Sequence, residues 1–292
     1  MVKFEYKAPR TLEEALSILD KSESHATVLA GGTDLVPLMK RSQIRPSLIM
    51  DVKKIPALNR LEWSSSDGLH IGAAVSLSKL TSFRPLAERY GTLAQACSII
   101  GSTQVRNWAT IGGNICNAAP SADTAPALLC LGARAVLSHL HGTRAIPLED
   151  FFLGPGQTSM KQNELLVEIE IPTPSTPSAG CYLKHKTREG MDIAVAGVAS
   201  FLFLDPQGNM LQDVRIALGA VAPTPIRAEQ AEAVLIGRTP SKASIEEAAR
   251  LAVEVASPIS DIRASAEYRK EMVKVLTQRS LHKCCEALGI KI

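Results

Sequence analysis

The stretch at residues 109–123, A-T-I-G-G-N-I-C-N-A-A-P-S-A-D, constrains this chain more than any other feature. It sets the pair Gly112-Gly113 among short polar side chains, although the segments on either side of it are apolar. A connection this long and polar is uncommon in a compact chain unless it has a function. Its small donors and acceptors could contact a ribityl chain, a ribose or a pyrophosphate. We therefore expect a fold built around a ligand that this loop contacts.

A second glycine pair, Gly31-Gly32, follows the apolar run 27–30 and precedes a predicted helix at 35–40. Glycines at a strand-to-helix junction let the backbone approach a ligand and direct N–H groups toward an anion. A plain tight turn would have the same sequence pattern. Neither loop has the G-x-G-x-x-G of a Rossmann fold or the G-K-[ST] of a P-loop. Two such loops suit an extended dinucleotide whose phosphates are met at separate points.

Composition excludes several other classes of protein. With 292 residues, 46% of them hydrophobic, the chain is long enough for two or three packed units. The formal charge of +3 includes no basic run, so we expect no nucleic-acid partner. The N-terminus lacks an apolar signal core and the longest apolar run, 193–204, is too short for a bilayer, so we expect a cytoplasmic protein without membrane contact. The six cysteines lack zinc or iron–sulfur spacing, so we expect no metal site.

The hydrophobic pattern divides the chain into three units. Residues 1–55 are predicted to form a βαβ unit, with Thr11-x-x-Glu14 as the capping box of its helix. Residues 56–174 are predicted to form an α+β unit that begins with a hairpin turning at Asp67-Gly68. Prolines at 172, 174 and 177 mark a linker, because proline cannot pair in a central strand. Residues 178–292 are predicted to form a sheet followed by three helices.

These residues resemble the FAD-binding medium subunits of molybdenum hydroxylases, in particular those of the xanthine dehydrogenase type. The resemblance lies in L-A-G-G-T-D-L at 29–35 and in the 109–123 loop, and it continues through K-x-x-x-R-E-G-M-D-I-A at 184–194 and A-P-T-P-I-R at 222–227. It implies an α+β fold of the vanillyl-alcohol-oxidase (PCMH-like) type, in which two subdomains enclose FAD and a C-terminal domain of sheet and helices follows. The segment N-I-C-N-A-A-P-S-A-D is most similar to the purine type.

The resemblance also implies which residues contact FAD. Asp123 would accept a hydrogen bond from the flavin N3–H, Lys184 would stabilise the anionic reduced flavin, and Leu166 would pack against the ring. Without the resemblance, Asp123 is better interpreted as a helix N-cap and Lys184 as an exposed strand lysine. In chain order, the glycine loop at 29–35 is the first loop and the one at 109–123 is the second. The first loop and the 110–114 stretch of the second would hold the phosphates and the ribityl chain. The implied contacts are Thr27, Val28, Leu29, Ala30, Gly31, Gly32, Thr33, Asp34, Ala109, Thr110, Ile111, Gly112, Gly113, Asn114, Asn117, Asp123, Leu166 and Lys184.

The implied role is electron transfer. A molybdenum cofactor and [2Fe–2S] clusters would lie on a large and a small partner subunit, and electrons would leave this chain's noncovalently bound FAD as a hydride to NAD⁺. Arg188, Glu189 and Asp192 would border the flavin and nicotinamide pocket, or else are solvated turn charges. The alternatives are the FAD subunit of a carbon monoxide, nicotinate or aldehyde hydroxylase, and a nonenzymatic nucleotide-binding module. A self-sufficient flavin oxidase is a further alternative, but the sequence shows no clustered His, Tyr and Asp set.

Overall fold

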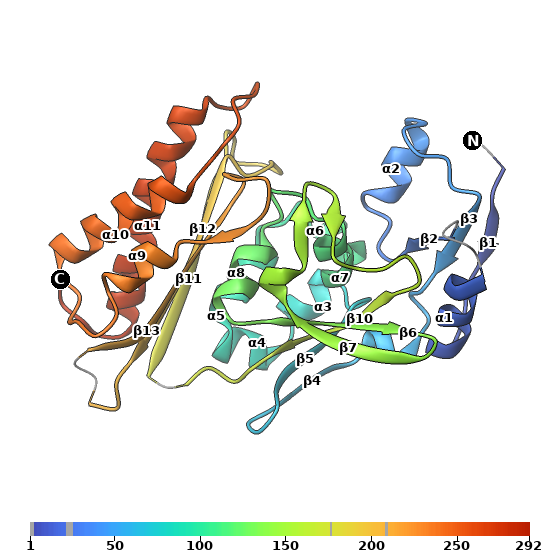
Figure 1. Ribbon diagram of the computed structural model, residues 1–292, viewed down its shortest axis with the longest axis horizontal. Coiled ribbons are helices and arrows are strands. Elements are labelled where there is room, and N and C mark those ends of the chain that lie inside the picture. Colours follow the sequence, from blue (N-terminus) through green and yellow to red (C-terminus); the bar gives the residue numbers. More distant parts are fainter. Residues whose placement is uncertain (1–2, 22–25, 176, 208–209) are drawn as a thin grey trace.

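Three sheets lie in a row in the computed structural model, which describes residues 3–21, 26–175, 177–207 and 210–292 (Figure 1). A three-stranded sheet lies near the N-terminus, a five-stranded sheet in the middle, and a four-stranded sheet at the other end. Helices pack against each sheet, so the architecture is α+β. Within the described ranges, no helix is both long enough and apolar enough to cross a bilayer.

The N-terminal unit is a small parallel sheet with two helices. The strand order is β1-β3-β2, and both neighbouring pairs are parallel. The glycine pair Gly31-Gly32 falls between β2 and α2, where the sequence predicts it. The predicted capping box forms only in part: Glu14 N donates to Thr11 Oγ1, but the Glu14 carboxylate accepts from the N–H of Arg10. The elements are β1 (Glu5–Lys7), α1 (Leu12–Lys21), β2 (Ala26–Leu29), α2 (Leu35–Lys40) and β3 (Leu48–Asp51).

The central unit is an antiparallel sheet packed against short helices. The strand order is β4-β5-β10-β6-β7, and the hairpin β4–β5 turns where the sequence predicts it. Leu69, Ile71 and Ile169 point from this sheet into a core shared with the helices. The elements are η1 (Pro56–Asn59), β4 (Leu61–Ser64), β5 (Gly68–Gly72), α3 (Leu77–Thr81), α4 (Arg84–Arg89), α5 (Gly91–Ser98), α6 (Thr103–Trp108), α7 (Ile111–Cys116), α8 (Thr124–Cys130), β6 (Arg134–His139), β7 (Gly142–Pro147), η2 (Leu148–Asp150), β8 (Phe152–Gly154), β9 (Gln157–Thr158) and β10 (Leu165–Ile171).

The 109–123 stretch is more ordered than the sequence indicates. We expected an irregular loop, but its first half is the helix α7. Thr110 is the N-cap of this helix, and its Oγ1 accepts a hydrogen bond from Gly113 N at 3.0 Å. Two adjacent glycines lower helix propensity, which concealed the helix from the sequence pattern. The cap and the burial of Ile111 and Ile115 stabilise it nevertheless.

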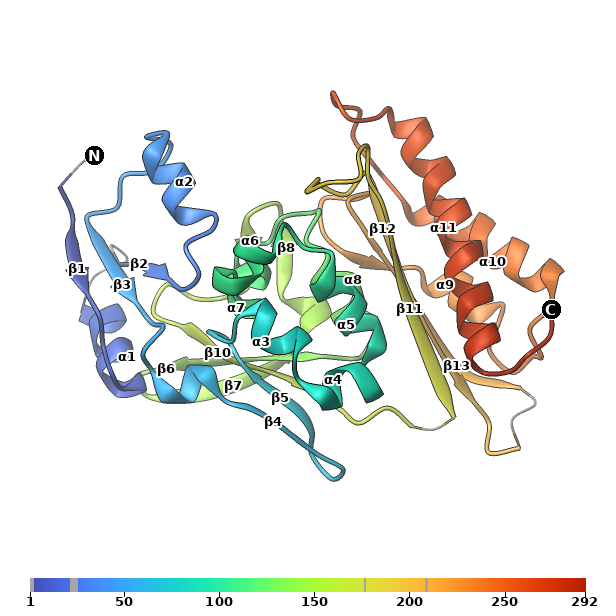
Figure 2. The same cartoon turned by 180° about the vertical axis from the view of Figure 1, so that it is seen from behind.

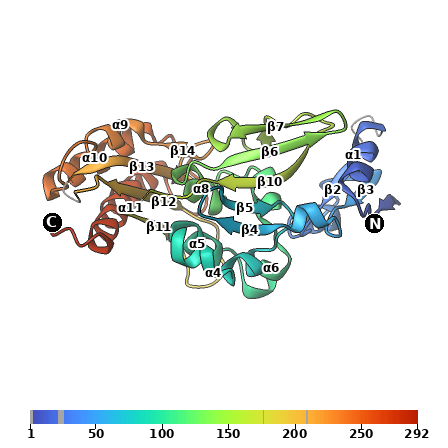
Figure 3. The ribbon, with the colours of Figure 1, turned by 90° about the horizontal axis from the view of Figure 1, so that it is seen from below.

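The C-terminal unit is an antiparallel sheet covered on both faces (Figures 2 and 3). All nine residues of β12 are buried, and alternate residues face opposite sides. Val198 and Leu202 belong to a core with α10 and α11, whereas Ala199 and Phe201 belong to the core of the central unit. The sheet is therefore a wall shared by two cores. Its elements are β11 (Ser178–His185), β12 (Ala196–Leu204), β13 (Leu211–Gly219), β14 (Ile226–Arg227), α9 (Glu229–Ala233), α10 (Lys242–Val255) and α11 (Ala266–Ala287).

A buried carboxylate fixes the segment between β9 and β10. Glu164 accepts hydrogen bonds from Arg144 Nε at 2.7 Å, from Arg144 Nη2 at 2.9 Å and from Lys161 N at 2.8 Å. Arg144, on β7, also donates to Ser159 O at 2.9 Å. These bonds tie residues 159–164 to the edge of the central sheet. The Arg144 guanidinium lowers the pKa of the Glu164 carboxyl.

Replacing Glu164 with Gln should destabilise the fold in a pH-dependent manner. Because the folded-state pKa of Glu164 is depressed, its stabilisation is present above the unfolded-state pKa of about 4.3 and is lost as pH falls through the folded-state value. We expect a loss of about 1–2 kcal/mol at pH 7, since Arg144 is partly exposed, and a smaller loss below pH ~4. Urea unfolding at both pH values measures it, with Glu246→Gln on the exposed face of α10 as the control. A loss that does not change with pH would contradict the electrostatic account.

Candidate functional site

A cavity of about 880 Å³ lies where the three units meet. Both glycine loops, the start of β10 and two loops of the C-terminal unit contribute to its lining. Cofactor and small-molecule sites have volumes of roughly 300–1,000 Å³, so this cavity is large enough for a cofactor. A second hollow of about 640 Å³, beside α1 and β1, contains none of the predicted site residues.

Most of the predicted FAD contacts line this cavity. Three do not: Thr27, Leu29 and Ile111. Successive side chains of a strand point to opposite faces, so Thr27 and Leu29 lie on the other side of β2 from Val28. Ile111 is fully buried in the core of the central unit. Contacts of these three residues with FAD stay predictions. The predicted residues that line the cavity are Val28, Ala30, Gly31, Gly32, Thr33, Asp34, Ala109, Thr110, Gly112, Gly113, Asn114, Asn117, Asp123, Leu166 and Lys184.

The first loop offers free backbone donors. Gly32 has a φ of +72°, a left-handed conformation that glycine adopts without strain. The N–H groups of residues 31–34 have no hydrogen-bond acceptor in the part of the chain that the structure describes. Successive free N–H groups around a left-handed residue form a concave site for an anion. This geometry suits a phosphate.

In the second loop, by contrast, the backbone donors of residues 111–114 are already used. Ile111 N donates to Val75 O at 3.1 Å, and Gly112 N donates to Ala73 O at 3.0 Å. Gly113 N and Asn114 N both donate to Thr110, at 3.0 Å each, through its side chain and its carbonyl. We expected backbone N–H groups of both loops to meet phosphates. Residues 31–34 therefore suit that role better than residues 111–114, and the second loop also contributes small polar side chains.

The glycines of the two loops also allow the loops to pack closely. A Cβ on Gly31 would lie 2.1 Å from Trp108 O, immediately before the second loop. A Cβ on Gly112 would lie 2.6 Å from Ala73 O. Real Cβ atoms do not approach backbone oxygens this closely, so a side chain at either position would force the backbone segments apart. The glycine pairs therefore fix the width of the cavity as well as the conformation of its lining.

A buried ion pair joins the second loop to the C-terminal sheet. Lys184 Nζ, on β11, donates to Asp123 Oδ2 at 2.8 Å, and the two side chains are only 5% and 8% exposed. Tyr182, two residues earlier on the same strand, donates from its hydroxyl to Asp123 Oδ1 at 2.8 Å. Asp123 and Lys184 also line the cavity. The site thus carries a fixed positive and a fixed negative charge side by side.

Burial governs the ionisation of this group. Burial raises the pKa of Asp123, while the nearby Lys184 charge and the two hydrogen bonds oppose the rise. Burial and the Asp123 carboxylate raise the pKa of Tyr182 well above its usual value, so its hydroxyl remains a donor. The plainer interpretation holds for Asp123 in position only, and it is wrong for Lys184. Asp123 begins α8 but makes no capping bond with its side chain, and Lys184 is not exposed.

The loop between β11 and β12 forms the C-terminal side of the cavity. Arg188 and Asp192 line the cavity, as expected, whereas Glu189 does not. Asp192 accepts from Thr187 Oγ1 at 2.5 Å and from Ile193 N at 2.9 Å, and these bonds lower its pKa to about 2. Asp192 therefore orders the loop as a permanent carboxylate.

Several residues that line the cavity, and Tyr182, which bonds to Asp123, were not predicted from the sequence. Tyr182 had a usable signal, because residues two apart on a strand share a face and Lys184 had been predicted. Met191 and Ile193 lie in the 184–194 motif, which was quoted for the resemblance without assigning them a contact. Arg263 lies in an irregular loop, far along the chain from every motif.

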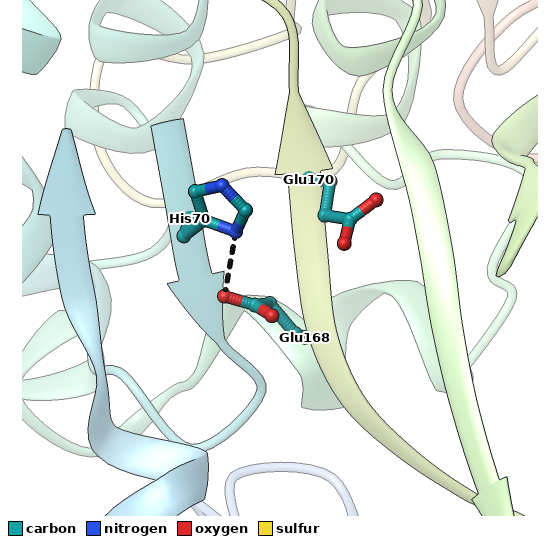
Figure 4. A group of neighbouring side chains, drawn as sticks. All are labelled: His70, Glu168 and Glu170. Atoms are coloured by element: carbon teal, nitrogen blue, oxygen red, sulfur yellow. Dashed lines mark hydrogen bonds and ion pairs between the residues drawn. The ribbon is translucent and has the colours of Figure 1, made fainter. Parts of the chain in front are cut away.

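A group of three potential metal ligands lies outside the cavity lining. His70 on β5 and Glu168 and Glu170 on β10 gather on one face of the central sheet (Figure 4). His70 Nδ1 lies 3.0 Å from Glu168 Oε1, and Arg60 Nη1 lies 3.6 Å from the same oxygen. Cross-strand polar pairs of this kind stabilise sheets without any ligand. We assign no metal to the group.

Comparisons with known proteins match both halves of the chain. The family described as FAD binding domain in molybdopterin dehydrogenase matches residues 2–174, and the CO dehydrogenase flavoprotein C-terminal domain matches residues 181–284. The chain is 35% identical to the carbon monoxide dehydrogenase medium chain of Hydrogenophaga pseudoflava over 280 residues, 96% of each chain. It is 32% identical to the putative xanthine dehydrogenase FAD-binding subunit of Escherichia coli over 289 residues, 98% of each. The solved carbon monoxide dehydrogenase of H. pseudoflava superposes with a TM-score of 0.92, at 35% identity, over 97% of both chains.

The chain therefore belongs to the family of FAD-binding subunits of molybdenum hydroxylases, and FAD is its cofactor. The resemblance seen in the sequence is confirmed. So is the predicted fold class, an α+β FAD-binding domain followed by a C-terminal domain of sheet and helices.

Replacing Gly31 with Ala should weaken FAD binding. The new Cβ would lie 2.1 Å from Trp108 O, so the loops must separate and the free N–H groups must move. We expect the affinity for FAD to fall by about tenfold or more, a cost of about 1.4 kcal/mol or more. Flavin absorbance per chain after gel filtration measures it. The control is Gly91→Ala, where a Cβ meets nothing within 4 Å. Full flavin content in a folded Gly31→Ala chain would contradict the role of this contact.

Proposed function

We propose that this chain is the electron-exit subunit of a molybdenum hydroxylase, which receives electrons from [2Fe–2S] clusters on a partner and passes them through FAD to NAD⁺. The observation that carries the proposal is that acid–base groups in the cavity are already engaged. Asp123 is paired with Lys184, and Asp192 accepts from its own loop. The described lining includes no His, Tyr or Glu, and Asp34 is an exposed residue beside α2. An oxidase that transforms its own substrate needs a free acid or base beside the flavin.

The residues present fit FAD in shape and polarity. The free N–H groups of residues 31–34 would hold the pyrophosphate. Thr110, Asn114 and Asn117 would reach the hydroxyl groups of the ribityl chain and the ribose. Leu166 would pack against the flavin ring, beside Asp123. When bound, FAD supplies redox chemistry that connects one-electron clusters with a two-electron acceptor.

The ion pair is proposed to set the electrostatics at the flavin end of the cavity. The free lone pairs of Asp123 would accept a hydrogen bond from the flavin N3–H. Lys184 holds a positive charge where negative charge would accumulate on reduction, and its burial strengthens that effect because little water screens it. Tyr182 keeps the carboxylate oriented.

We propose that FAD is held without a covalent bond. Cys116 is the cysteine of the second loop, and its side chain lines the cavity. Burial raises the pKa of its thiol to about 12, so it is not a thiolate at neutral pH. Its Sγ lies 3.7 Å from Met160 Sδ, in apolar surroundings. Denaturation with acid would then release all of the flavin.

The molybdenum cofactor and the iron–sulfur clusters are proposed to lie on a large and a small partner subunit. Relatives are named as medium chains, which supports this division. For the substrate of the holoenzyme we propose a purine, because the segment at 114–123 is most similar to the purine type. The second candidate is carbon monoxide, nicotinate or an aldehyde. Relatives named for carbon monoxide, glyceraldehyde and xanthine are 35%, 34% and 32% identical, so overall identity does not decide between them.

Electron donors should distinguish this role from that of a complete oxidase. In anaerobic stopped-flow experiments, NADH should bleach the flavin of the isolated, FAD-loaded chain, whereas xanthine, carbon monoxide, nicotinate and glyceraldehyde should not. Adding the two partner subunits should allow reduction by one of these substrates, and we expect xanthine. Rapid bleaching of the isolated chain by any of them would contradict the proposal, and a different substrate in the complex would reassign the class.

Replacing Lys184 with Met in that complex should slow transfer to NAD⁺ more than substrate oxidation. We expect a decrease on the order of tenfold in NADH formation, because the cation that offsets negative charge at the flavin is lost. Purine oxidation with a dye that accepts electrons from the partner subunits should change by less than about twofold. Lys274→Met, at an exposed position of α11, is the control. Equal loss in both assays would indicate a structural effect alone.

A further inference from the structure

One buried arginine holds three loops of the C-terminal domain, two of which line the cavity. Arg269, on α11, is 4% exposed. Its Nη1 donates to Val195 O at 2.7 Å, at the end of the β11–β12 loop, and to Ala220 O at 3.2 Å, after β13. Its Nη2 donates to Asp261 Oδ1 at 2.8 Å, in the loop before α11. Ala220 N in turn donates to Pro120 O at 2.7 Å, so the second glycine loop is bonded to the segment after β13 that Arg269 holds.

Asp261, which Arg269 holds in place, also binds Arg263, a residue that lines the cavity. Asp261 accepts from Arg263 N and from Arg263 Nη1, each at 2.9 Å. The N–H of Arg263 holds the pKa of Asp261 well below its usual range, so the carboxylate stays ionised. Two arginines around one carboxylate leave a positive excess. The Nε and Nη2 groups of Arg263 have no acceptor among the residues described, so a positioned guanidinium retains unused donors.

Arg263 lines the cavity on its C-terminal side, as does Lys184 at the proposed flavin end. His185, next to Lys184 on β11, lies against Tyr268 at the start of α11, with His185 Nε2 3.1 Å from the Tyr268 hydroxyl. This contact joins the first turn of α11, which follows the loop of Arg263, to the strand that carries Lys184. The same loop and the β11–β12 loop rise side by side at the top of the C-terminal domain in Figures 1 and 2, with α2 on the far side. A ligand that reaches the flavin ring from this side passes Arg263.

We propose that Arg263 binds the pyrophosphate of the dinucleotide electron acceptor. The inference rests on the proposed transfer to NAD⁺, because a nicotinamide that meets the flavin must have its pyrophosphate at the open side of that end. Arginine suits the role, since its planar fork makes paired hydrogen bonds to phosphate oxygens. FAD carries the same chemical group, but the free N–H groups of residues 31–34, at the opposite unit, already provide for it.

The experiment uses the full FAD-loaded chain as wild type, Arg263→Ala, Arg263→Lys and a control, Arg279→Ala, an exposed arginine of α11. Three quantities are measured: flavin per chain, the Kd of ADP-ribose by calorimetry, and the NADH dependence of flavin bleaching. ADP-ribose carries the pyrophosphate without the nicotinamide. We expect Arg263→Ala to weaken ADP-ribose binding and to raise the half-saturating NADH concentration by about tenfold to a hundredfold. Arg263→Lys should recover part of this loss, while flavin content and the limiting bleaching rate should stay within about twofold.

Other outcomes contradict the proposal, or contradict the proposed transfer to NAD⁺ on which it rests. Loss of flavin from Arg263→Ala, with unchanged ADP-ribose affinity in the chains that keep flavin, would reassign Arg263 to FAD. Unchanged affinity for both ADP-ribose and NADH would remove any role in anion binding. If NADH fails to bleach even the wild type, the proposed transfer to NAD⁺ fails. The subsite itself would then stand only if ADP-ribose still binds and the binding still requires Arg263.

Discussion

The buried ion pair between Asp123 and Lys184 is the interaction on which the site depends, because it connects two separately built parts of the molecule. Asp123 ends the second glycine loop, and Lys184 lies on the first strand of the C-terminal sheet. Removing two charges from water costs several kcal/mol each, and a buried pair is weak evidence for stability. The hydroxyl of Tyr182 offsets part of that cost. Such a pair is better explained by what it does at the cavity, where it fixes charge beside a redox cofactor.

The two glycine loops have different tasks. Gly31 permits a close approach of the N-terminal unit to the central unit that a Cβ would prevent, and Gly112 permits a close approach to Ala73 within the central unit. The first loop keeps the N–H groups of residues 31–34 free, whereas α7 and its neighbours use those of residues 111–114 in the second. The C-terminal domain then closes the cavity with loops that Arg269 orders. Each unit thus supplies one kind of contact to a shared cavity.

Local patterns predicted much of this arrangement. Alternation and turn residues located most strands of the three units, though not the short β8, β9 and β14, and the glycine loops indicated a dinucleotide, because these signals lie in neighbouring residues. The helix α7 was hidden because adjacent glycines lower helix propensity, and α4 and α6 were missed because neither carries a run of apolar residues at helical spacing. Thr27 and Leu29 were included because the loop was treated as a block, without the alternation of β2. Arg263 and Arg269 could not be found, since hydrogen bonds between distant loops leave no periodic trace in the sequence.

The orientation of FAD in the cavity is the central claim, and an experimental structure of the FAD-loaded chain tests it most directly. The account predicts the pyrophosphate on the N–H groups of residues 31–34, and the flavin ring beside Asp123, Leu166 and Lys184, with the ion pair intact. A flavin ring against the first loop, with the pyrophosphate beside Lys184, would contradict it. So would a cofactor bound outside this cavity.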